Sequence, residues 1–175
     1  MRGTAELDTL AGNLGLEHVL SRRIRTQHSL RITDTTNRDL RYEYQLSLRW
    51  AVADRWTVRA TGGATLEPPD FQAYQGQVAF ERDWEGRWFV GLFGRYYTDD
   101  GLVRDPKIVS DASPPLDTWQ VGLTCRHQAT RWAAQVSAGP YGTRYDEVPM
   151  ISRHFSTLYA DRDWLWVQAA VNFRF

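Results

Sequence analysis

Apolar and polar residues alternate along most of this chain. Between residues 40 and 52, in LRYEYQLSLRWAV, an apolar side chain stands at every second position, and Arg, Glu, Gln, Ser and Ala fill the positions between. A period of two residues predicts a strand with one apolar and one polar face. Thirteen alternating residues make a long strand, since about 5–6 is usual in soluble proteins. The pattern therefore predicts long, two-faced strands.

A tryptophan opens several of the predicted strands. The segments ADRW, EGRW, ATRW and DRDW end at Trp56, Trp88, Trp132 and Trp164. Two of the three intervals between these residues are roughly 32 residues long, a period typical of repeated supersecondary units. Each unit reads as a long strand, a tight turn, a second long strand and a longer loop. We predict strands over residues 14–21, 24–34, 40–52, 56–66, 73–84, 87–98, 118–127, 131–142, 152–160 and 164–175.

The connections between these strands are alternately short and long. All short turns should therefore lie at one end of the sheet and all long loops at the other. Because a meander of long strands has exposed edges unless it closes, we expect an all-β, antiparallel, up-and-down barrel of about 10 strands (8–10). Residues 1–13 would precede it, and residues 14–175 would form the barrel domain. Pro140, which cannot donate to a strand ladder, is expected near the loop end of its strand.

Composition excludes some classes of protein. Lys and Arg together number 21, as do Asp and Glu, so the basic excess of a nucleic-acid-binding protein is missing. One cysteine, Cys125, rules out an internal disulfide framework. The sequence has no run of about 18 apolar residues, so no transmembrane helix is predicted. The start, MRGTAELDTL, lacks a signal-peptide pattern, so an exported chain would be a mature form or a fragment.

The aromatic residues favour a membrane setting for the apolar face. Trp and Tyr prefer the membrane–water interface, and a row at each end of the strands is typical of a transmembrane barrel. A soluble barrel with an apolar interior around a ligand is the alternative. The predicted short-turn row is Trp56, Trp88, Trp132 and Trp164, and the predicted loop-end row is Tyr42, Tyr74, Tyr96 and Tyr97.

The C-terminal stretch WLWVQAAVNFRF adds a family resemblance. Ala169, Val171 and Phe173 alternate before the terminal aromatic Phe175. This resembles bacterial outer-membrane β-barrel proteins, whose last strand typically ends in an aromatic residue, most often Phe. The resemblance implies an outer-membrane location among lipid and lipopolysaccharide, and recognition of the final strand by the barrel-assembly machinery. The strands are also similar to the barrel of exopolysaccharide-export proteins, although no helical-repeat motif is present.

The polar face would line the lumen of such a barrel. Arginine predominates over glutamate on it, which favours anions if the lumen conducts. We therefore expect a transport or export channel with a narrow or plugged lumen. A structural or surface-interaction barrel acting through residues 99–117, with a salt-bridged lumen, remains an alternative. The predicted lumen-lining residues are Arg41, Glu43, Arg49, Arg59, Glu81, Arg95, Arg126 and Arg174.

Catalytic and metal-binding signals are sparse. His154 and Ser156 share a strand face, and a His beside a Ser can activate a nucleophile. This is similar to the His-x-Ser pair of outer-membrane lipid A deacylases, but Gln168 stands where an orienting carboxylate is needed, so ordinary strand polarity is favoured. His18 and His28 should meet across the first hairpin without a third ligand. We expect no metal and no cofactor.

Overall fold

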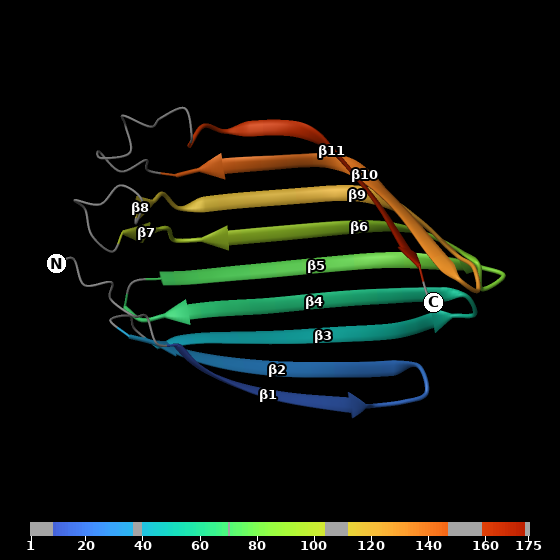
Figure 1. Cartoon of the computed structure of the whole chain (residues 1–175), viewed down its shortest axis with the longest axis horizontal. Helices are drawn as coiled ribbons and strands as arrows, with labels where there is room; N and C mark the ends of the chain where they lie inside the picture. Colours follow the sequence, from blue (N-terminus) through green and yellow to red (C-terminus); the bar gives the residue numbers. More distant parts are fainter. Residues whose placement is uncertain (1–8, 37–39, 70, 104–111, 147–158, 174–175) are drawn as a thin grey trace.

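The computed structural model is built almost entirely of long antiparallel strands (Figure 1). It describes residues 9–36, 40–69, 71–103, 112–146 and 159–173. The long strands are β1 (Thr9–Val19), β2 (Ile24–Thr35), β3 (Arg41–Ala53), β4 (Trp56–Glu67), β5 (Phe71–Trp84), β6 (Trp88–Asp99), β9 (Leu116–Gln128), β10 (Trp132–Tyr145) and β11 (Arg162–Phe173). A two-stranded sheet, β7 (Leu102–Val103) with β8 (Ala112–Ser113), lies within the β6–β9 connection.

The nine long strands form one sheet in chain order, from β1 at one edge to β11 at the other. Each pairs antiparallel with the next. Short turns join β1 to β2, β3 to β4, β5 to β6 and β9 to β10 at one end, and the remaining connections lie at the other. The predicted all-β, up-and-down meander is confirmed. The predicted alternation of short and long connections is wrong at β4–β5, because Glu67 and Phe71 are as close along the chain as Trp84 and Trp88, which flank the β5–β6 turn.

The last hairpin differs from the sequence-based prediction. β10 continues to Tyr145 and pairs directly with β11, with Thr143 opposite Arg162. Most of the predicted strand 152–160 lies outside the described residues, and its last two residues are not in a strand. Trp164 therefore lies beside Tyr141 at the loop end, so its predicted place at the short-turn end is wrong. The cause is that the chain returns into β11 from a long connection and not from a tight turn.

Two strand details also differ from expectation. Pro140 lies inside β10, where its partner on one side is Leu165 of β11. On the other side the β9–β10 register skips Gly139 and Pro140 and resumes at Tyr141, because proline cannot donate to the ladder. β1 begins at Thr9, inside the segment that was expected to precede the barrel.

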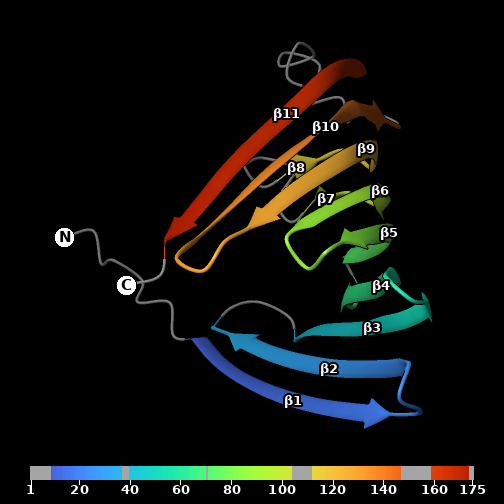
Figure 2. The same ribbon diagram turned by 90° about the vertical axis from the view of Figure 1, so that its right-hand side faces the viewer.

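The sheet is strongly curved, and its two edges stay apart. Figure 2 shows an open arc with β1 and β11 at its ends. No pairing joins β1 to β11 among the described residues, so barrel closure is not observed. Both strands begin at the loop end and finish at the short-turn end. A direct β1–β11 pair would consequently be parallel, whereas all neighbours within the sheet are antiparallel.

The concave face is the polar one. The rings of Phe93 on β6 and Trp166 on β11 lie 6.0 Å apart although β9 and β10 separate their strands, so this face curves inward. Gln120 and Ser137 on the same face are 3% and 5% exposed. On the opposite face Leu123 is 64% exposed. Burial is therefore inverted relative to a soluble barrel, in which apolar side chains fill the interior.

The β5–β6 turn carries a backbone conformation that its sequence does not favour. Glu85 has a φ of 57° and is followed by Gly86 with a φ of 68°. A left-handed conformation costs a residue with a Cβ roughly 1–2 kcal/mol, and Asn tolerates it better than Glu. Glu85→Asn is expected to raise the free energy of unfolding by about 0.5–1 kcal/mol, measured by urea denaturation. The same change at Arg87, which lacks a positive φ, should give no gain, and equal effects at both sites would contradict the assignment.

Candidate functional site

The charged residues predicted to line a lumen share the concave face. The cross-strand register brings their positions on β3, β4, β5, β6 and β9 onto the same side as the buried Gln120. Arg174 lies outside the described residues. The residues so placed are Arg41, Glu43, Arg49, Arg59, Glu81, Arg95 and Arg126.

One carboxylate near the short-turn end holds two arginines. Arg59 Nη2 lies 2.8 Å from Glu81 Oε1, and Arg126 Nη2 lies 3.5 Å from the same oxygen. The Glu81 side chain is only 16% exposed. The guanidinium of Arg126 also lies over the ring of Phe89, 4.2 Å from its centroid. Because a buried carboxylate is costly unless paired, the two guanidinium groups offset the cost of burying Glu81.

Arg49 adds a cation that this carboxylate does not neutralise. It stands directly opposite Arg25 on one side and Arg59 on the other. Arg25 has a long ion pair with Glu17, at 4.0 Å. Arg49 forms no ion pair or hydrogen bond within the part of the chain that the structure describes. The positive charge of Arg49 is therefore uncompensated. Like charges on opposed residues destabilise a sheet, so this row of arginines repels itself.

A hollow of about 710 Å³ lies beside Arg49, Arg59 and Glu81. Its charged lining consists of Arg49, Arg55, Arg59 and Arg126 against Glu81 and Asp83. Asp83 is engaged locally, since its Oδ1 accepts a hydrogen bond of 2.7 Å from the Gly86 N–H. The Nε of Arg126 is buried and has no hydrogen-bond partner among the described residues. The charged lining of the hollow thus has a positive balance.

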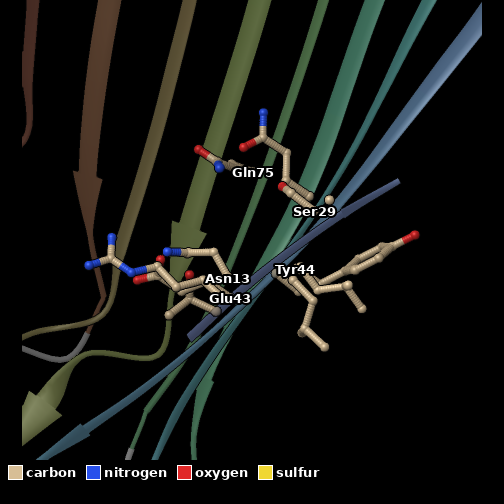
Figure 3. Close-up of a pocket in the computed structure, with 12 residues that line it drawn as sticks. Asn13, Ser29, Glu43, Tyr44 and Gln75 are labelled. Carbon is tan, nitrogen blue, oxygen red and sulfur yellow. The ribbon is translucent and has the colours of Figure 1, made fainter. Parts of the chain in front are cut away.

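A second hollow, of about 420 Å³, lies over β1 to β5 and has a different chemistry. Figure 3 shows Asn13, Ser29, Glu43 and Gln75 around it, whereas the Tyr44 ring points away from them. Glu43 is paired with Arg41 at 2.8 Å. This part of the concave face is consequently polar with its main carboxylate neutralised.

The concave face also carries an aromatic group that sequence reasoning missed. Tyr141 and Trp164 stack with their centroids 4.8 Å apart, and Trp166 meets Phe93. Room for the Phe93 ring comes from Gly122, where an added Cβ would lie 2.9 Å from that ring. The available signal was the phase of β11, since Trp164 and Trp166 alternate with the exposed Leu165 and Val167.

The convex face has aromatics at both ends of its strands. At the short-turn end Trp56 stacks on Phe80 at 4.6 Å, and Trp88 and Trp132 flank the His127 ring at 4.3 and 4.9 Å. At the loop end Tyr42, Tyr74 and Tyr96 share this face. Tyr97 does not, because it pairs with Gln75 on the concave side, so its predicted membership of this row is wrong.

The predicted catalytic pair and the C-terminal aromatic cannot be located. His154, Ser156 and Phe175 lie outside the described residues. The rings of His18 and His28 do meet, 5.9 Å apart, and His28 Nδ1 lies 2.8 Å from the hydroxyl of Tyr44. Within the described ranges no group of three or more His, Cys, Asp or Glu residues could hold a metal ion.

None of the described residues belongs to a helix of the length and apolar character needed to cross a membrane. Comparison with protein-family models and with curated proteins found no match to this chain.

Proposed function

We propose that this chain forms a β-barrel of the bacterial outer membrane whose polar, arginine-rich lumen transports or exports solutes. The inversion of the two faces carries this proposal, because apolar side chains cover the convex face and polar side chains occupy the concave one. Transmembrane barrels need this arrangement, since lipid surrounds them and water or polar side chains fill the interior.

Strand length and aromatic placement support the same proposal. The nine long strands have 11 to 14 residues, and a tilted strand needs about 9–11 to cross a bilayer. The rows of Trp and Tyr at opposite ends of the convex face correspond to the two lipid–water interfaces. Outer-membrane lipid and lipopolysaccharide are then the surroundings of this face. The barrel-assembly machinery is the expected partner of the C-terminal strand.

The charge of the lumen gives the first functional test. Arg49 and Arg95 form no ion pair among the described residues, so exchanging them leaves no partner carboxylate unpaired. The double variant Arg49→Glu, Arg95→Glu should change an anion preference into a cation preference. The reversal potential across a planar bilayer under a KCl gradient should change sign.

The matched control is the double variant Arg22→Glu, Arg131→Glu, which makes the same charge change in two short turns. It should keep the reversal potential of the parent protein. An unchanged reversal potential in the lumen variant would contradict the anion preference. Equal shifts in both variants would show that the net charge of the protein, and not the position of Arg49 and Arg95, causes the change.

A structural barrel that does not conduct is the second candidate. The ion pairs Arg59–Glu81 and Arg41–Glu43 favour it, because they link side chains of the concave face to one another. A protein that refolds into bilayers but gives no conductance steps would support this reading. An apolar-ligand carrier lacks support, since the concave face is polar.

A lipid-modifying enzyme that uses His154 and Ser156 would hydrolyse lipid acyl chains, and Ser156→Ala would abolish that hydrolysis.

A further inference from the structure

We propose that Arg49, Arg59 and Arg126 form a binding site for an oxyanion, a carboxylate or a phosphate, at the short-turn end of the concave face. The site rests on the proposed function only in taking this face as a lumen. Binding itself needs no transport. Its ligand class follows from the guanidinium group, whose planar N–H donors match the oxygens of both anions.

The cross-strand register explains why an anion is needed. Arg25, Arg49 and Arg59 stand directly opposite one another on three neighbouring strands, where opposed Cβ atoms are about 4.5–5.5 Å apart. The two outer members of this row each have a carboxylate nearby: Glu17 lies 4.0 Å from Arg25, and Glu81 lies 2.8 Å from Arg59. Arg49, in the middle, has no acidic partner in the described part of the chain. An anion beside Arg49 and Arg59 would remove the repulsion between them.

Arg126 supplies further donors to the hollow. Its side chain is 31% exposed and lines the hollow, and a guanidinium group has more N–H donors than the single Glu81 contact uses. Phe89 under the guanidinium and Glu81 beside it restrict the motion of this side chain. The hollow has a volume of about 710 Å³. This volume is large enough for an oxyanion and several waters, since one water occupies roughly 30 Å³.

Glu81 acts here as a positioning residue. Its Oε1 lies near both Arg59 and Arg126, so it holds these two cations together on neighbouring parts of the sheet. One carboxylate cannot neutralise three guanidinium groups. The residual positive charge therefore attracts the ligand, while the fixed ion pairs reduce the entropy lost when the ligand binds.

The direct test measures equilibrium binding in detergent. Refolded protein is titrated with inorganic phosphate and, separately, with acetate by isothermal titration calorimetry at low salt. Wild type should bind at least one of them saturably, and affinity should fall as NaCl rises. Arg49→Gln should bind about 10-fold more weakly, as expected for one charge-assisted contact. Arg49 has no contact that folding needs, so this variant should refold normally.

The matched control is Arg31→Gln, an arginine on the same face outside this hollow, which should bind like wild type. Arg126→Gln should weaken binding as Arg49→Gln does. Phosphate binding without acetate binding assigns a tetrahedral ligand, and the reverse assigns a carboxylate.

No saturable binding by folded wild type, or equal affinity in Arg49→Gln, would overturn the site. The outcomes also separate the two proposals. Conductance with a sign change in the lumen variant but without saturable binding removes the site alone. Binding without conductance removes transport alone.

Discussion

Replacing Gly139 by valine is expected to prevent this sheet from forming. A Cβ at Gly139 would overlap the backbone carbonyl oxygen of Val121 and lie 2.5 Å from the Cα of Gly122. Backbone atoms cannot move aside as a flexible side chain can, so β9 and β10 would have to separate. Overpacking of this kind typically costs about 1–3 kcal/mol, and more where backbone is displaced. Gel mobility of boiled and unboiled samples should show no heat-dependent shift for Gly139→Val.

The matched control is Gly94→Val on β6. A Cβ at Gly94 would meet no atom within 4 Å, and a β-branched residue suits a strand. This variant should therefore refold like the parent protein. If Gly139→Val kept the heat-dependent shift, the close approach of β9 and β10 and the placement of Phe93 over Gly122 would both be incorrect.

Leu123→Arg is expected to have the second-largest effect, because it tests what surrounds the convex face. Leu123 is 64% exposed and lies opposite Leu92 on one side and Ala138 on the other. In water, a charged residue at so exposed a site would change stability by about 0.5 kcal/mol or less. Against the middle of a bilayer it costs roughly 2–4 kcal/mol. Urea denaturation in phospholipid vesicles should therefore show a loss of that size, with a lower yield of inserted protein.

Gln45→Arg is the control for the second prediction. Gln45 is exposed on the concave face, opposite Ser29 and Gly63. An arginine there would stay on the concave face and should leave insertion unchanged. Equal tolerance of both substitutions would show that lipid does not cover the convex face, and the membrane proposal would then fail.

Much of the fold was accessible from the sequence because strand alternation is a local property. Successive side chains of a strand point to opposite faces, so residues 40–52 already separate Tyr44 and Leu46 from Glu43 and Arg49. The register keeps that separation across the sheet, and the predicted lumen residues that the structure describes share one face for this reason. Turn residues also predicted the tight turns before Trp56, Trp88 and Trp132, which the structure contains.

The candidate site depended on information that alternation does not contain. Arg49 opposes both Arg25 and Arg59 only in the observed register. The Arg49–Arg59 pairing follows from the turn at Asp54 and Arg55 and from an irregularity between Ala51 and Ala53, since turn geometry decides pairing in hairpins, whereas the Arg25–Arg49 pairing belongs to the separate β2–β3 register. The ion pairs of Glu81 and the buried Nε of Arg126 also require strand order and packing.

The last strand also shows which features alternation predicts and which it does not. The phase of residues 164–173 correctly separates the exposed Leu165 and Val167 from Trp164 and Trp166. It does not reveal that Trp164 lies at the loop end, because a strand pattern is the same whichever neighbour the strand pairs with. Contact between Phe93 and Trp166 across two intervening strands arises from the curvature of the whole sheet.

Alternation along the chain is sufficient to predict a meander of long strands with one apolar and one polar face, because side-chain period and turn residues act over a few neighbouring positions. Three features appear only in the folded structure: the polar face is concave, β10 pairs directly with β11, and Glu81 pairs with both Arg59 on β4 and Arg126 on β9, although two strands separate β4 from β9. Those features depend on register, strand order and curvature, which are set by contacts between residues far apart in the chain.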